Sequence, residues 1–287
     1  MNTTRRTFLK TAALAGAAAA LPGCVSTPVR KGVPKDGLFP AAPNFHTTPG
    51  ASVMISGGTI TKDGKLTVAV SAAHRLQYGP RKKILLVLHA SEPSRRDADE
   101  KKLAALFADD NYAVESLHHW EGAAALRKIA EAEAFFLSGG ETFLLLRTLY
   151  ESGQLDILRE RVLAGVPYNG SSAGSNVAGI NIGCTNDFPV VDVPTRSALG
   201  VWPTVVNPHH PRANDTDYGA RVNKIKIYCR LNPGETVLGI GNGAVARLNA
   251  GRITIEHGPA FYYHGGEHRE LKEGPVPELT ALVSAKA

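Results

Sequence analysis

Residues 166–178, VPYNGSSAGSNVA, join a short apolar run to a cluster of small residues. The run at 166–169 predicts a buried strand, and residues 173–178 predict a short helix. Between them, Gly170-Ser171-Ser172-Ala173-Gly174 places Ser172 in a Gly-x-Ser-x-Gly frame. This frame is typical of a sharp strand-to-helix turn that exposes a serine hydroxyl and aims backbone N–H groups toward it. Because the chain contains 29 glycines, the frame by itself is only weak evidence for a catalytic serine. The motifs elsewhere in the sequence decide whether Ser172 has this role.

Apolar runs and helical patterns alternate on both sides of this segment. Strands are predicted at residues 66–71, 84–90, 112–117, 134–138 and 166–169. Helices are predicted at residues 97–108, 122–132, 142–151, 155–163 and 173–178. Short antiparallel strands that close the domain are predicted at residues 236–240, 244–248 and 252–256. This alternation predicts a three-layer α/β/α sandwich with a mainly parallel sheet, which resembles the flavodoxin-like and class I glutamine amidotransferase-like folds.

The N-terminus has the features of an export signal. Arg5-Arg6 precedes Phe8-Leu9 and an alanine-rich apolar segment at 11–21. That segment is too short for a comfortable membrane span, which needs about 20 apolar residues. The paired arginines resemble a bacterial twin-arginine signal, which implies that the protein folds first and then crosses the membrane through the twin-arginine export machinery.

A lipid anchor is predicted directly after this segment. Leu21-Pro22-Gly23-Cys24 resembles a lipobox, in which residues 1–23 are removed and Cys24 is acylated; the alternative is simple cleavage and release. Residues 24–50 contain five prolines and predict an extended tether, which leaves residues 51–287 as one globular domain. We therefore expect a location on the periplasmic side, with a membrane contacted only through the N-terminal lipid.

The charge content argues against a nucleic-acid-binding protein, and the cysteine content does not indicate a disulfide-rich one. Removal of Arg5, Arg6 and Lys10 with the signal lowers the formal net charge from +6 to +3. The compact basic run at 81–83 only precedes a predicted strand, so no nucleic-acid partner is expected. Cys184 and Cys229 could pair in an oxidising compartment, but two cysteines in so large a domain are more often independent.

Four motifs follow one another along the chain and include the Ser172 turn. They are Gly139-Gly140-Glu141-Thr142-Phe143, Gly170-Ser171-Ser172-Ala173-Gly174, Thr185-Asn186-Asp187-Phe188-Pro189 and Asn207-Pro208-His209. Their order and spacing resemble the peptidase E family of serine peptidases, which includes aspartyl dipeptidases and is related to cyanophycinase. The likeness covers about residues 84–258. It implies a serine exopeptidase or dipeptidase that hydrolyses short peptides without a cofactor, within a catalytic domain at residues 51–287.

The resemblance also implies roles for individual residues. Ser172 would be the nucleophile, and His209 would take its proton and deliver it to the leaving amine. His210 is the rival, but the Asn-Pro-His register favours His209. The oxyanion donors would be the Ala173 N–H and an N–H of the Gly139-Gly140 turn, where the missing side chain permits close approach.

The third catalytic position departs from the family. Members of the family carry a glutamate in a Gly-x-x-Glu-Gly segment that orients the histidine, whereas the matching segment at 239–243 places Asn242 there. An amide oxygen can fix the imidazole tautomer, as in papain-like enzymes, but brings no negative charge to stabilise the imidazolium. Asp187 is the other acidic candidate, either beside the histidine or in shaping the site. A weakened catalyst is one expectation, and a peptide-binding lipoprotein without activity is the alternative.

The residue that would bind the substrate is a second difference from the family. In the family an arginine downstream of the histidine is thought to hold the carboxylate of an N-terminal aspartate, a task that suits its bidentate fork. Tyr218 falls at that position here, and the nearby Arg221 is either its substitute or an ordinary solvated surface residue. Glu141 is either a polar wall of the substrate pocket or a first-turn helix acid. The resemblance to the family, more than these residues, makes dipeptides of the Asp-X type the expected substrates, and β-aspartyl bonds, as in cyanophycinase, are the alternative.

No metal is expected. His118-His119 are interpreted as packing or surface histidines. His264, Glu267 and His268 could bind an ion, but their spacing and context do not match a metallopeptidase helix.

Overall fold

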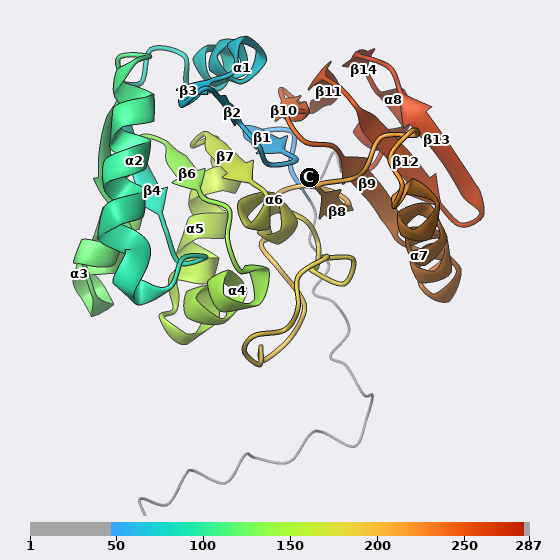
Figure 1. Cartoon of the computed structure of the whole chain (residues 1–287). Helices are drawn as coiled ribbons and strands as arrows, with labels where there is room; N and C mark the ends of the chain where they lie inside the picture. Colours follow the sequence, from blue (N-terminus) through green and yellow to red (C-terminus); the bar gives the residue numbers. More distant parts are fainter. Residues whose placement is uncertain (1–46, 284–287) are drawn as a thin grey trace, which may run out of the picture. The chain divides into compact units, whose positions relative to one another are not determined.

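An eight-stranded mixed sheet forms the centre of the computed structural model, which describes residues 47–283. The strand order is β14-β11-β10-β1-β7-β6-β4-β5 (Figure 1). Five adjacent strands are mutually parallel: β1 (Val53–Ser56), β7 (Tyr168–Ser171), β6 (Phe135–Leu137), β4 (Lys83–Val87) and β5 (Ala113–Ser116). Three antiparallel strands extend one side: β10 (Val245–Asn249), β11 (Arg252–His257) and β14 (Gly274–Pro275). The prediction of a mainly parallel sheet is confirmed.

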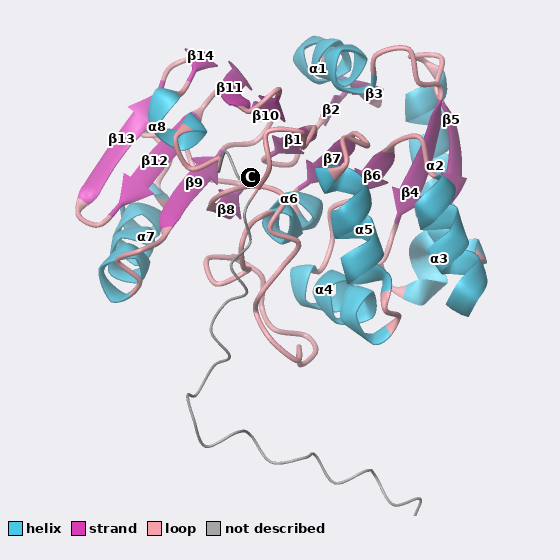
Figure 2. Ribbon diagram, turned by 180° about the vertical axis from the view of Figure 1, so that it is seen from behind, coloured by secondary structure: helices cyan, strands magenta, loops and turns pink. Residues whose placement is uncertain are grey.

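Helices cover both faces of this sheet (Figure 2). One face carries α1 (Val68–Tyr78) and α2 (Arg96–Ala108), and the other carries α3 (Gly122–Glu131), α4 (Thr142–Glu151), α5 (Gln154–Leu163) and α6 (Ala173–Ala178). Successive side chains of a strand point to opposite faces. Leu86 accordingly lies in one apolar cluster with Phe107 of α2, whereas Leu85 and Val87 lie in another with Leu146 of α4. The predicted α/β/α sandwich is therefore confirmed.

A second, four-stranded sheet carries the C-terminal part of the site. Its order is β13 (Glu267–Leu271), β12 (Ala260–His264), β9 (Thr236–Ile240) and β8 (Val205–Pro208). Helix α7 (Tyr218–Leu231) connects the parallel strands β8 and β9 and packs Ile225 and Cys229 against Val237 and Phe261. Residues 236–240 thus do form a strand, but in this second sheet. The predictions for 244–248 and 252–256 agree with the antiparallel strands β10 and β11.

The prediction of a strand at residues 66–71 is wrong. Helix α1 begins at Val68, and the Thr67 hydroxyl caps it by accepting a hydrogen bond from the Val70 N–H at 3.3 Å. The apolar residues alternate only locally; over the whole segment Val70, Ala73 and Tyr78 are buried at helical spacing. The first strand of the domain is instead the four-residue β1, which is buried throughout.

The remaining elements are short. They are β2 (Thr61–Lys62), β3 (Lys65–Leu66), η1 (Pro93–Arg95), η2 (Leu117–His119) and α8 (Pro277–Thr280). Cys184 and Cys229 are both free thiols. None of the helices within residues 47–283 has the length and apolar character needed to cross a membrane. The predicted signal, the Cys24 lipidation site and residues 24–46 of the predicted tether lie outside the described residues.

Candidate active site

Ser172 lies in the turn between β7 and α6, as its sequence frame predicts. Its backbone adopts φ +52° and ψ −108°, a conformation that L-residues rarely hold and that costs on the order of 1–3 kcal/mol. The Ser172 N–H donates to the Ser56 carbonyl at 3.1 Å, which ties the turn to the end of β1. At Gly174, an added Cβ would lie 2.2 Å from the Leu137 carbonyl oxygen. The second glycine of the frame therefore lets α6 pack directly on β6.

His209 follows β8 and faces Ser172. Its Nε2 lies 2.7 Å from the Ser172 Oγ, which is hydrogen-bonding distance for proton transfer. The His209 backbone also has a positive φ of +53°, and its N–H donates to the Gly57 carbonyl at 3.0 Å. The second sheet and the end of β1 thus hold the imidazole against the strand-to-helix turn of the first sheet.

Asn242 completes a hydrogen-bonded row. It lies in the turn between β9 and β10, with its Oδ1 2.6 Å from the His209 Nδ1. When Nδ1 carries the proton and donates to this amide oxygen, the Nε2 lone pair faces the serine hydroxyl. The neutral amide fixes the orientation of the ring without placing a negative charge beside it.

Two glycines after β1, Gly57 and Gly58, belong to the site although no sequence motif indicates them. A Cβ added to Gly58, whose φ is +95°, would lie 2.2 Å from the His209 Cε1. The Gly58 backbone, which has no side chain, therefore packs directly against the imidazole ring. Ser56-Gly57-Gly58 ends a buried strand, which is where ligand sites occur in parallel sheets, but this signal was lost because β1 was not predicted.

The turn after β6 approaches Ser172 from the opposite side. A Cβ on Gly139 would lie 3.1 Å from the Ser172 Cβ, and Gly140 has φ +135°. Within residues 47–283, the backbone N–H groups of Gly139, Gly140 and Ala173 donate to no protein acceptor. Such N–H groups beside a serine hydroxyl are the donors that an oxyanion requires.

Asp187 does not contact the imidazole. Its Oδ2 accepts a hydrogen bond of 2.8 Å from the Thr142 N–H at the start of α4. The neighbouring Asn186 donates from Nδ2 to the Pro208 carbonyl at 2.8 Å. Asp187 therefore lies at the start of α4, just after the Gly139-Gly140 turn, and not beside the histidine.

His210, the rival base, points away from Ser172. Its Nε2 lies 2.7 Å from the Tyr263 hydroxyl and its Nδ1 lies 2.8 Å from the Pro211 carbonyl oxygen. Burial lowers the pKa of His210 to about 4, so the ring is neutral at physiological pH. The structure therefore brings His209, not His210, to the serine.

The two predicted substrate contacts occupy other positions. The Tyr218 hydroxyl lies 3.3 Å from the His268 Nε2, within the aromatic cluster under the second sheet. Arg221 donates from one terminal nitrogen to the Asn207 Oδ1 at 3.1 Å and to the His209 carbonyl at 3.4 Å. Tyr218 thus packs away from Ser172, and Arg221 supports the backbone of the His209 segment.

A pocket of about 400 Å³ adjoins Ser172 through Gly139. It is lined by segments after β1, β4 and β6 and by α2, including Thr59, Ala90, Ser138, Gly139, Lys102 and Leu103. Glu141 is part of its wall and is also the N-cap residue of α4, so its position fits both of the predicted alternatives. The pocket lies where the strand order reverses, because β4 leads outward to β5 and β6 leads back to β7. Ligands of open α/β sheets bind at such switch points.

A serine hydroxyl, an imidazole and an amide oxygen in one row, at the carboxyl edge of a largely parallel sheet, are the arrangement of an α/β serine hydrolase. The profile of peptidase family S51 matches residues 52–256. The chain belongs to this family and is a serine peptidase. A profile of the twin-arginine translocation pathway signal sequence matches residues 2–22, so the protein carries a signal for export across the membrane.

Named relatives agree with this assignment, and a solved structure shares the fold. Peptidase E of Shewanella amazonensis is 35% identical over 180 residues, which cover 60% of this chain and 74% of that protein. Peptidase E of Shewanella denitrificans is 32% identical over 204 residues, covering 70% and 86% of the two chains. The crystal structure of a peptidase from an acI-B1 Actinobacterium has the same fold, with a TM-score of 0.53 at 16% identity, and covers 77% of this chain and 97% of that one.

Proposed function

We propose that the protein is an exported dipeptidase that uses Ser172 as nucleophile and His209 as general base. The observation that carries this proposal is the row of short contacts, 2.7 Å from the Ser172 Oγ to the His209 Nε2 and 2.6 Å from the His209 Nδ1 to the Asn242 Oδ1. Asn242 holds the tautomer in which Nε2 accepts the hydroxyl proton.

The chemistry proceeds in two halves. The Ser172 oxygen bonds to the peptide carbonyl carbon while its proton passes to the His209 Nε2. The N–H groups of Ala173 and of the Gly139-Gly140 turn stabilise the resulting oxyanion. The imidazolium then protonates the leaving amine, and the C–N bond breaks to give an acyl-enzyme. Water, deprotonated by His209, releases the acid and restores the hydroxyl.

The pocket supports a substrate of dipeptide size that carries both signs of charge. At about 400 Å³ it lies near the lower end of the usual range for ligand pockets. Its wall offers Arg95 and Lys102 as cations and Glu92, Asp99 and Glu141 as acids. Arg95 is 3.9 Å from Asp99, whereas Lys102 makes no ion pair within residues 47–283. We assign Glu141 to the free amino group of the substrate and Lys102 to a carboxylate.

The proposal has two further parts. The first is a preference for an N-terminal aspartate, and the second is attachment of the exported domain to a membrane. Lys102, rather than Arg221, is the cation available for the aspartate side chain, because Arg221 is bonded to Asn207 and His209. Acylation of Cys24 would keep the exported domain at the periplasmic face of a membrane.

A dipeptide panel tests the proposed function. We expect hydrolysis of Asp-X dipeptides with kcat/KM about tenfold or more above matched Leu-X dipeptides, and none by Ser172→Ala protein; tenfold corresponds to about 1.4 kcal/mol. Faster hydrolysis of β-aspartyl dipeptides would indicate the cyanophycinase-like alternative. Binding of dipeptides without turnover by the folded wild-type protein would contradict the proposal.

A further inference from the structure

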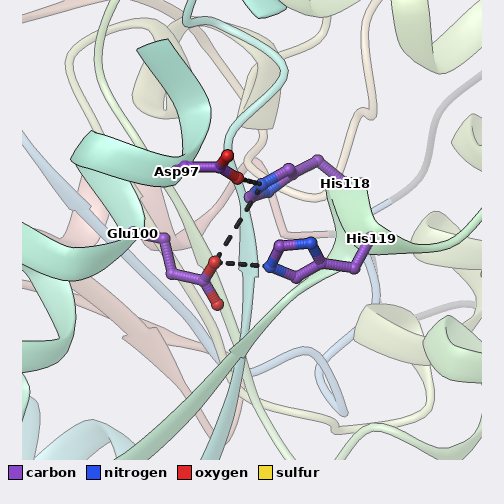
Figure 3. A group of neighbouring side chains, drawn as sticks. All are labelled: Asp97, Glu100, His118 and His119. Atoms are coloured by element: carbon purple, nitrogen blue, oxygen red, sulfur yellow. Dashed lines mark hydrogen bonds and ion pairs between the residues drawn. The ribbon is translucent and has the colours of Figure 1, made fainter. Parts of the chain in front are cut away.

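Four potential metal ligands converge at the far edge of the main sheet (Figure 3). Asp97 and Glu100 lie one helical turn apart near the start of α2, and His118 and His119 lie in η2 directly after β5. One ligand atom from each residue lies within 4.8 Å of the ligand atoms of the other three. The cluster shares no residue with the Ser172 site.

The separations between these atoms are close to those around a tetrahedral ion. The His118 Nε2 is 2.9 Å from the Asp97 Oδ1 and 4.0 Å from the Glu100 Oε2, and the His119 Nε2 is 2.6 Å from that same Oε2. Zinc–ligand bonds of about 2.0–2.1 Å in a tetrahedron place the ligand atoms about 3.3 Å apart. These three distances lie on both sides of this value, and all pairs lie within 4.8 Å, so a tetrahedron would require side-chain rotations that open the short pairs and close the long one.

Ser116 orients two of the four ligands. Its hydroxyl lies 2.6 Å from the His118 Nδ1, and its backbone N–H donates to the Glu100 Oε1 at 3.1 Å. The first contact turns the His118 Nε2 toward the cluster, and the second leaves the Glu100 Oε2 directed between the two imidazoles, as Figure 3 shows. Hydrogen bonds of this kind, made by the distal atoms of a ligand, are the usual outer shell of a metal site.

We propose that Asp97, Glu100, His118 and His119 bind one divalent transition-metal ion, with zinc as the first choice. Two carboxylates neutralise the charge of a dication, and two neutral imidazoles complete four-coordination. Imidazole ligands favour zinc and its transition-metal neighbours over magnesium and calcium, which prefer sites made only of oxygen.

The site has a consequence for the peptidase pocket. The same helix that supplies Asp97 and Glu100 lines the pocket through Lys102 and Leu103. A bound ion would fasten the start of α2 to the end of β5. Its effect would be to stiffen one wall of the pocket and to stabilise the fold, without taking part in the reaction at Ser172.

Calorimetric titration of zinc into the chelator-treated, exported protein at pH 7.5 tests this inference. We expect one equivalent to bind with a Kd in the micromolar range or tighter. Asp97→Asn and His119→Ala should each weaken binding by at least about tenfold, because the first replaces a charged ligand with a neutral amide and the second removes a ligand atom. The Asp97 side chain is 88% exposed and that of His119 is 49% exposed, so the substitutions leave the core intact.

His257→Ala is the matched control. His257 is also 49% exposed and pairs with a glutamate, Glu273, at 3.0 Å, but within residues 47–283 it belongs to no group of three or more potential ligands. This variant and Ser172→Ala should both bind zinc as the wild type does, the latter whether or not the protein hydrolyses dipeptides. Zinc should also raise the Tm of the wild type but not of Asp97→Asn. Absence of binding, or equal binding by all variants, would overturn the proposal and leave the cluster as hydrogen-bonded ion pairs only.

Discussion

Replacing His209 with alanine is expected to lower kcat/KM by about 10⁴-fold or more, the scale of loss seen when a catalytic base is removed from a serine hydrolase. The His209 Nε2 is 2.7 Å from the Ser172 Oγ, and the other histidine of the motif, His210, is turned toward Tyr263 and Pro211. No second imidazole within residues 47–283 contacts the serine hydroxyl. Steady-state kinetics on the preferred dipeptide measures the effect.

A double variant serves as the control for this prediction. Ser172 and His209 act as one unit, so Ser172→Ala combined with His209→Ala should be no less active than either single variant. The thermal unfolding of the His209→Ala protein should stay close to that of the wild type, because the imidazole is exposed. Retention of wild-type kcat/KM by folded His209→Ala protein would remove the residue from the mechanism.

Two substitutions of Asn242 are expected to have opposite effects: alanine should lower kcat/KM and aspartate should raise it. Asn242→Ala removes the acceptor 2.6 Å from the His209 Nδ1, leaves the tautomer unfixed and should lower kcat/KM by about 10²-fold. Asn242→Asp keeps the shape and adds a charge that stabilises the imidazolium, so we expect a gain of about tenfold.

The pH profile distinguishes these effects from a loss of structure. The active form has a neutral imidazole at His209, and a carboxylate at position 242 favours the protonated ring. We therefore expect the acid limb of kcat/KM to move to higher pH in Asn242→Asp. Asn242→Glu should likewise keep or raise activity, because position 242 faces the imidazole. An unchanged rate and pH profile in both Asn242→Ala and Asn242→Asp would place the orienting group elsewhere.

The layered α/β fold could be predicted because its central strands are short apolar runs between amphipathic helices. β4 and β6 are buried on both faces, which leaves a continuous hydrophobic signal in the sequence. The first strand and helix of the domain, at residues 53–78, could not be assigned in this way. There a capped helix, α1, begins with alternating residues, and the four-residue β1 gives too short a pattern to recognise.

The chemistry-bearing residues were predictable only where a local motif accompanies them. The Gly-x-Ser-x-Gly frame and the Asn-Pro-His motif identify Ser172 and His209, and the structure brings their side chains together. Gly58 has no motif, and its contact with the imidazole depends on a pairing between sheet ends 151 positions apart in the chain. The same limit applies to His118 and Asp97, whose proximity arises only when α2 packs beside β5.

Labelling with a fluorophosphonate, followed by mass spectrometry of the digested protein, tests the role of Ser172 most directly. An activated serine beside oxyanion donors should form one covalent adduct, located on the peptide that contains Ser172, and labelling should be much slower in His209→Ala protein. Folded wild-type protein that remains unlabelled, or an adduct located on a different residue, would contradict the assignment of Ser172 as the nucleophile.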